Sequence, residues 1–110
     1  MEKFIKGDVI VVPFPFSDLT HSKRRPALVI TTLQGNDVIL CQITSKEVKD
    51  SYAIKLKESD FLNGALHAES NIRPNRLFTA DKAIILYKIG HLNNVKMQEV
   101  IDEIISLIRG

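Results

Sequence analysis

Polar side chains that can bind an anion or move a proton gather where the expected strands of this chain begin and end. They are Arg25, Thr44, Ser45, Arg73, Arg76 and His21. A guanidinium presents a planar fork of donors that matches phosphate or carboxylate oxygens. A phosphodiester under attack needs such donors, and it needs a hydroxyl or imidazole to help orient the attacking group. Because RNA carries its own nucleophile, the 2′-hydroxyl, these residue types fit a small metal-free phosphodiester site. The alternative is that Arg25 pairs with an acidic side chain and Thr44 only closes a turn.

The segment around Arg25 predicts how two of these groups are positioned. Pro26 favours an extended Arg25 and cannot donate to a strand ladder, so we expect a loop to become a strand at this pair. The β-branched run that follows, a turn signal at 34–37 and a second apolar run to Ile43 predict a hairpin. The start of the first strand of a hairpin lies beside the end of the second. We therefore expect Arg25 and Thr44 to be neighbours.

Short strands dominate the rest of the sequence. We expect further strands over 9–14, 52–57, 69–78 and 83–86. Pro74 places the third of these at a sheet edge or a bulge. Residues 58–64 are expected to be a connection, with a turn at their Asn-Gly pair.

One helix is expected at the C-terminal end. Asn93 or Asn94 can cap it, and Gly110 can end it. Its apolar face comprises Met97, Val100, Ile101, Ile104 and Ile108. The predicted fold class is therefore a β-rich α+β domain, in which this helix packs on a small, strongly bent barrel or open sheet of antiparallel strands.

Length and composition indicate a single domain over residues 1–110. The chain has 110 residues and 45% hydrophobic content, enough for a modest core. Its 15 Lys and Arg against 13 Asp and Glu give a net charge of +2, so an anion site must arise from local clustering rather than bulk charge. One cysteine, no recognisable signal peptide and no bilayer-length apolar run lead us to expect a cytoplasmic protein without a membrane partner.

Several kinds of site are not indicated by the sequence. His21, His67 and His91 are widely separated and the single cysteine has no ligand-spaced companion, so no metal or other cofactor is expected. Cys41 lies in an apolar run and is predicted to fill the core rather than act as a nucleophile.

An ordered set of motifs spans nearly the whole chain. It comprises Gly-Asp-Val at 7–9, Val-Pro-Phe-Pro-Phe-Ser-Asp-Leu at 12–19, Lys-Arg-Arg-Pro-Ala-Leu-Val-Ile at 23–30, Ile-Thr-Ser at 43–45, Ile-Arg-Pro at 72–74 and Leu-Phe-Thr-Ala-Asp-Lys at 77–82. Together these motifs resemble the MazF/PemK (Kid-like) toxin family. The resemblance implies an SH3-like barrel with a C-terminal helix, assembled as a homodimer. It also implies a sequence-selective endoribonuclease of a toxin–antitoxin pair.

The resemblance further implies a reaction, partners and residue roles. Such toxins cleave single-stranded RNA without metal, by attack of the 2′-hydroxyl that leaves a cyclic phosphate. A cognate antitoxin inhibits them, and the complex commonly binds operator DNA. By position, Arg25 would stabilise the pentavalent phosphate and take part in proton transfer, and Thr44 would orient the phosphate. Arg73 matches a further arginine of the PemK-like branch, and His21 falls in a loop where some members carry a contributing histidine. Additional RNA contacts are expected from Lys23, Arg24, Ser45, Asn75, Arg76 and Phe16.

One position departs from the family pattern. PemK-like members often carry an aspartate two residues after the arginine matched by Arg73, and here that residue is Asn75. An amide cannot act as a general base at neutral pH, and a placed base contributes roughly a hundred- to ten-thousand-fold. The chain would then be slow or would rely on Arg25 and His21. The alternative function is a noncatalytic dimeric module that binds nucleic acid or an antitoxin.

Overall fold

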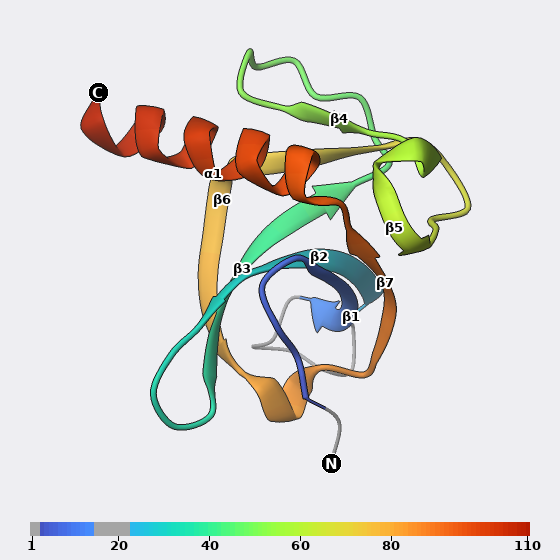
Figure 1. The fold of residues 1–110 in the computed structure, drawn as a ribbon, viewed down its shortest axis with the longest axis vertical. Helices are drawn as coiled ribbons and strands as arrows, with labels where there is room; N and C mark the ends of the chain where they lie inside the picture. Colours follow the sequence, from blue (N-terminus) through green and yellow to red (C-terminus); the bar gives the residue numbers. More distant parts are fainter. Residues whose placement is uncertain (1–2, 15–22) are drawn as a thin grey trace.

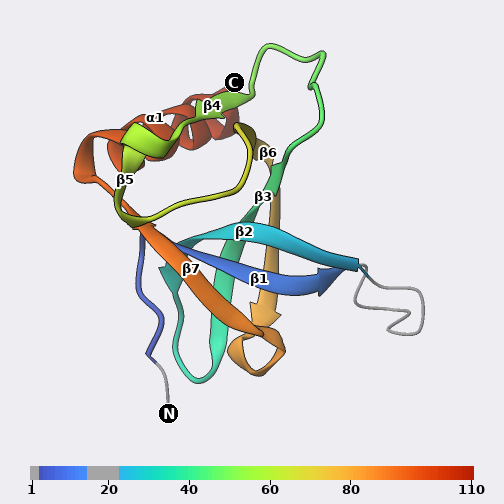
Figure 2. The ribbon, with the colours of Figure 1, turned by 90° about the vertical axis from the view of Figure 1, so that its right-hand side faces the viewer.

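A computed structural model describes residues 3–14 and 23–110 of the chain. Seven antiparallel strands form one sheet in the order β4-β6-β3-β2-β1-β7-β5, and one C-terminal helix packs on it (Figure 1). The strands are β1 Asp8–Phe14, β2 Lys23–Thr32, β3 Asp37–Thr44, β4 Ile54–Leu56, β5 Phe61–Gly64, β6 Ser70–Asp81 and β7 Tyr87–Leu92, and the helix is α1 Asn94–Arg109. Figure 2 shows β1 and β2 running across the direction of β3 and β6, so the sheet is strongly curled. The predicted β-rich class and barrel-like curl are confirmed.

The predicted hairpin is formed by β2 and β3. Leu28 pairs with Cys41, and the turn between the strands contains Gly35 with a φ of 72°, a conformation that glycine adopts without strain. The predicted start of the first strand was wrong, because β2 begins at Lys23 rather than after Pro26. Residues 23–26 pair with β1 alone, and β3 joins only from Ala27, so Pro26 lies on a half-open edge where its missing N–H is tolerated.

The predicted interruption at Pro74 is a bulge in β6. Cys41 of β3 pairs with Leu77 and Ile43 pairs with Ile72, so residues 73–76 of β6 face the single residue Gln42. The Cys41 thiol donates to the carbonyl oxygen of Arg73 at 2.9 Å. This contact satisfies a carbonyl at the point where the ladder is broken.

The second half of the sheet differs most from the predictions. Residues 61–64 form β5 instead of a connection, and 82–84 form a 3-10 turn that leads to β7 instead of a strand over 83–86. The Asn-Gly pair was misread as an isolated turn because Gly64 also allows close strand pairing. A Cβ on Gly64 would lie 2.2 Å from the Ile89 carbonyl oxygen, and one on Gly90 would lie 2.5 Å from the Asn63 carbonyl oxygen. The strand predicted over 52–57 is shorter and comprises only β4.

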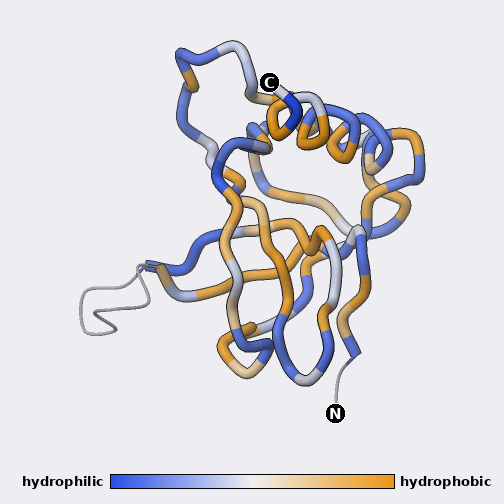
Figure 3. Tube along the Cα trace, turned by 90° about the vertical axis from the view of Figure 1, so that its left-hand side faces the viewer, coloured by the Kyte–Doolittle hydropathy of each residue, from blue (hydrophilic) through white to orange (hydrophobic). Residues whose placement is uncertain are grey.

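The apolar residues form two core clusters. One lies under α1 and includes Met97, Val100 and Ile104 of the helix, and the other lies within the curl and includes Ile10 and Leu40. The strands carry most of the hydrophobic residues, whereas the loop after β3 is mainly hydrophilic (Figure 3). No helix in the described part of the chain is long and apolar enough to cross a membrane.

The predicted C-terminal helix is confirmed. Asn93 is its N-cap and its side chain accepts from the Lys96 N–H at 2.8 Å. The predicted apolar face is buried only in its first part. Ile101 is half-buried, and Ile108 is 76% exposed because the last turn extends past β6 (Figure 1).

Asp8 is the buried charged residue of the described core, with 1% of its surface exposed. Its carboxylate accepts from the Ile5 N–H at 2.9 Å, contacts His91 Nδ1 at 2.9 Å and lies 3.5 Å from Lys88 Nζ. These contacts join the segment before β1 to β7. A buried carboxylate is tolerated here because several donors replace its lost hydration.

Candidate active site

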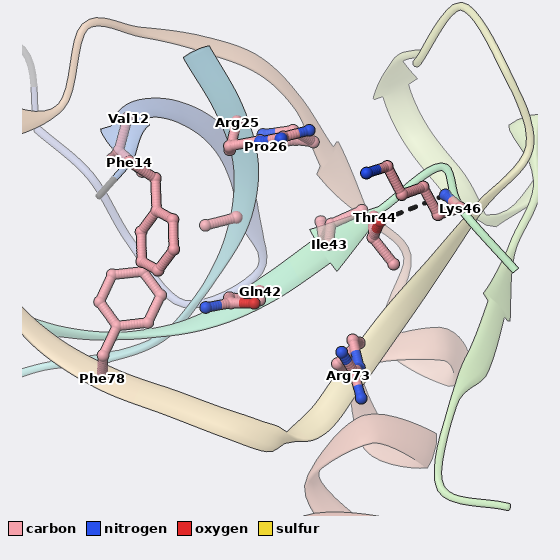
Figure 4. Close-up of a pocket in the computed structure, with 11 residues that line it drawn as sticks. Val12, Phe14, Arg25, Pro26, Gln42, Ile43, Thr44, Lys46, Arg73 and Phe78 are labelled. Carbon is pink, nitrogen blue, oxygen red and sulfur yellow. Dashed lines mark hydrogen bonds between the residues drawn. The ribbon is translucent and has the colours of Figure 1, made fainter. Parts of the chain in front are cut away.

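A pocket of about 200 Å³ lies where the start of β2, the end of β3 and the bulge of β6 meet (Figure 4). Its polar lining comes from Arg25, Gln42, Thr44, Lys46 and Arg73. The apolar lining comes from Val12, Phe14, Pro26, Ala27, Ile43 and Phe78. The pocket therefore combines three cationic side chains and a hydroxyl with a mainly apolar wall.

Arg25 and Thr44 meet at this pocket because of the hairpin register. Ala27 pairs with Gln42, and continuing that register by two residues sets Arg25 opposite Thr44. Both side chains are partly buried. The hydroxyl oxygen of Thr44 accepts from the Lys46 N–H at 3.2 Å, which leaves the hydroxyl proton available for an oxygen in the pocket. The expected proximity of Arg25 and Thr44 is thus present in the structure.

Lys46 is a pocket residue that sequence reasoning did not single out. Figure 4 shows its side chain folded back past Thr44 toward Arg25. Its position two residues after the hydroxyl at the end of a predicted strand was the available signal.

Arg73 reaches the pocket from the bulge of β6. Its NH2 donates to Asp50 Oδ2 at 3.0 Å, and the two side chains are 23% and 27% exposed. Its Nε is buried and has no hydrogen-bond partner among the described residues. Partial burial of Asp50 opposes ionisation, but hydrogen bonds from the Tyr52 N–H and from Arg73 outweigh it and lower the pKa of the Asp50 carboxyl below 3.8. The Asp50 carboxylate is therefore ionised at neutral pH.

Two aromatic rings form part of the apolar wall. The Phe14 and Phe78 ring centroids are 6.0 Å apart and the rings are tilted by 50°. This is the usual geometry of packed aromatic pairs. Phe14 thus packs on Phe78 and also lines the pocket.

Four more of the predicted site residues are His21, Phe16, Lys23 and Arg24. His21 and Phe16 are outside the described residues. Lys23 and Arg24 are exposed at the start of β2, where the Arg24 guanidinium lies 6.0 Å from the centre of the Tyr87 ring.

Three further predicted RNA contacts lie outside the pocket lining. Ser45 lines a separate hollow beside Asp50, and Arg76 is exposed on the bulge of β6. Asn75 faces a hollow against α1, beside Leu107. Asn75 is therefore not among the residues that line the pocket.

Cys41 is a structural thiol. Its side chain is buried, and this burial raises its pKa to about 12 despite the hydrogen bond to the Arg73 carbonyl. It therefore stays protonated at neutral pH and acts as a donor, as expected for a core residue. Within residues 3–14 and 23–110, no three His, Cys, Asp or Glu side chains are grouped so that they could hold a metal ion.

Solved structures with the same fold were found by structural comparison. MazF from Deinococcus radiodurans aligns with a TM-score of 0.74 over 100% of both chains at 16% sequence identity. The MazE–MazF complex from the same organism gives a TM-score of 0.77 over 96% of this chain and 95% of the other at 16% identity. A mycobacterial endoribonuclease, solved with its cognate antitoxin, gives 0.74 over 96% and 95% at 14% identity.

Sequence comparison identifies the family. A search of curated proteins found no match. A family model does match, and it covers residues 5–108. The match includes β1, the hairpin and the β6 bulge, which together line the pocket, and nearly all of α1. The chain therefore belongs to the PemK-like, MazF-like toxins of type II toxin–antitoxin systems.

Proposed function

We propose that this protein is an endoribonuclease that cleaves single-stranded RNA at the pocket between β2, β3 and β6. The observation that supports this proposal most strongly is the grouping of Arg25, Lys46 and Arg73 with the Thr44 hydroxyl on one pocket. Cations and a neutral donor suit a phosphate, whose charge increases when a fifth oxygen attacks. The apolar wall beside them suits the face of a base or the carbon atoms of a ribose.

The reaction that fits this donor set is transesterification within the RNA. The 2′-oxygen bonds to phosphorus, the bond from phosphorus to the 5′-oxygen breaks, and the products are a 2′,3′-cyclic phosphate and a 5′-hydroxyl. Arg25 would hold the non-bridging oxygens and Thr44 would donate to one of them. Arg73 would add a second guanidinium, and it is held in place on the β6 bulge. Lys46 would strengthen the positive field.

The proton of the 2′-hydroxyl needs an acceptor. Among the described residues that line the pocket there is no carboxylate and no imidazole, and arginine is not a base at neutral pH. His21 precedes Arg25 by four residues in the sequence. We propose His21 as the group that exchanges protons with the 2′-hydroxyl or the leaving 5′-oxygen.

Cleavage of a defined RNA in EDTA tests the proposed function. We expect purified protein to cut single-stranded RNA at a limited set of sites and to leave cyclic phosphate ends. The ends are identified by mass spectrometry of the fragments. RNA binding without any cuts, over RNAs that cover all short sequence contexts, would instead support the noncatalytic module. Cuts that require added divalent metal would contradict the proposed chemistry.

An antitoxin is the proposed protein partner. Related structures were solved with a cognate antitoxin or with MazE. For this chain we propose an antitoxin segment that covers the pocket and competes with RNA, and operator binding by the complex. Titration of the cognate antitoxin into the cleavage assay checks this: cleavage should stop near one antitoxin segment per pocket. Continued cleavage in a saturated complex would exclude occlusion of the pocket.

Because the proposed substrate is cellular RNA, the proposed place of action is the cytoplasm.

A homodimer is proposed from an exposed apolar surface next to the β6 bulge. Tyr52, Leu77 and Ile108 are 39%, 38% and 76% exposed, and with Leu107 they line one hollow. Exposed apolar patches of this kind mark interaction surfaces. We expect a dimer in sedimentation equilibrium, and we expect Ile108→Glu to weaken it at least tenfold. Ser106→Glu on the same exposed helix end is the control. A monomeric unsubstituted protein would contradict the proposal.

A further inference from the structure

The loop between β3 and β4 is connected to β6 by two side-chain contacts, one of them from the bulge. Asn71 of β6 donates its side-chain amide to the Lys46 carbonyl oxygen at 3.1 Å, near the start of the loop. Farther along, Arg73 of β6 donates to Asp50 at 3.0 Å. Lys46 and Arg73 both line the candidate active site, so this loop and the bulge together set the positions of two of its cations.

Asp50 is anchored independently of Arg73. Its Oδ1 accepts from the Tyr52 N–H at 3.0 Å, whereas its Oδ2 accepts from Arg73 NH2. The hydrogen bond from the Tyr52 N–H fixes the carboxylate on the loop backbone, so Oδ2 points in a defined direction. An ionised carboxylate is a stronger acceptor for guanidinium than a neutral group is.

Arg73 is restrained at both ends. Its carbonyl oxygen accepts from the Cys41 thiol, and its guanidinium is held by Asp50. The buried Nε has no partner among the described residues. Without Asp50, the described contacts would leave the guanidinium with no acceptor to restrict the rotamers of this long side chain. Asp50 itself lines a different hollow and is not among the residues that line the catalytic pocket.

We propose that Asp50 is a positioning residue that holds Arg73 in the orientation needed for the scissile phosphate. This inference rests on the proposed ribonuclease function. It also identifies Asp50 as the carboxylate that pairs with Arg73 in this chain. That carboxylate comes from the β3–β4 loop, whereas Asn75 lines the hollow against α1.

Single-turnover cleavage by loop variants tests this role. We expect Asp50→Ala to lower the maximal rate about tenfold with less than a threefold change in the half-saturating RNA concentration, because misplacement of a catalytic group costs one to two powers of ten. Asp50→Asn keeps an acceptor oxygen but loses the charge. Its maximal rate should therefore lie between that of Asp50→Ala and that of the unsubstituted protein. Asp50→Glu should recover part of the rate. Glu47→Ala, in the same exposed loop, is the matched control and should match the unsubstituted protein.

A double-mutant cycle separates positioning from a general effect on the fold. If Asp50 acts through Arg73, then Asp50→Ala should have no further effect in an Arg73→Ala background. Equal, additive losses would overturn the inference, and so would an unchanged rate in Asp50→Ala. Thermal unfolding of each variant checks that the fold is intact. Absence of cleavage by the unsubstituted protein would overturn the proposed function and the role of Asp50 with it. Normal cleavage by both unsubstituted protein and Asp50→Ala would overturn only this inference.

Discussion

Replacement of Arg25 with alanine is expected to lower the rate of RNA cleavage by about 100- to 1000-fold, the usual cost of one preorganised donor at a developing negative charge. Arg25 is partly buried and lines the pocket together with Thr44. Its guanidinium therefore faces the pocket from a strand rather than from a loop. Cleavage rates at saturating RNA, measured beside binding, check this expectation.

Two comparisons make the Arg25 result specific. Arg25→Lys keeps the charge but loses the planar fork, so it should recover only a small part of the activity. Arg109→Ala removes an exposed arginine at the end of α1 and should cleave as the unsubstituted protein does. Rates within threefold of the unsubstituted protein in Arg25→Ala would remove Arg25 from the catalytic assignment.

Replacement of Asp8 with alanine is expected to lower the free energy of unfolding by about 3 kcal/mol, because removal of one partner leaves buried donors without an acceptor. The carboxylate has contacts with the Ile5 N–H, His91 and Lys88, and it joins the segment before β1 to β7. The loss should appear as a lower midpoint in urea-induced unfolding with little change in slope.

Asp37 provides the control for Asp8. It is an exposed aspartate at the start of β3, so Asp37→Ala should change the unfolding free energy by less than about 0.5 kcal/mol. Asp8→Asn retains one acceptor oxygen, so its unfolding free energy should fall by less than that of Asp8→Ala. A change below about 1 kcal/mol in Asp8→Ala would mean that the cluster does not stabilise the fold.

Local signals explain which parts of the fold could be predicted. The β2–β3 hairpin, α1 and the irregularity at Pro74 were all indicated by turn residues, capping and periodicity within short windows. The pairing of β5 with β7 was not, because it depends on Gly64 and Gly90 approaching each other from distant segments. Local turn preferences predict a turn at the Asn-Gly pair and carry no information about the pairing of Gly64 with Gly90.

The same distinction applies to the pocket. The proximity of Arg25 and Thr44 followed from the register of one hairpin, so the sequence was sufficient to predict it. Lys46 and Asp50 lie in or beside a loop whose position depends on contacts with Asn71 and Arg73 of β6. No periodicity reports such contacts, and for this reason neither Lys46 nor Asp50 was among the predicted site residues.

The central claim is that the RNA's own 2′-hydroxyl attacks the phosphate bound at the Arg25 and Thr44 pocket. The most direct test replaces the single ribonucleotide before a mapped cut with its 2′-deoxy form and measures cleavage at that bond and binding of the same strand in EDTA. We predict that cleavage at that bond is abolished while binding changes less than threefold. Continued cleavage of the deoxy-substituted bond would contradict the account, because the attacking group would then have to be water or a side chain.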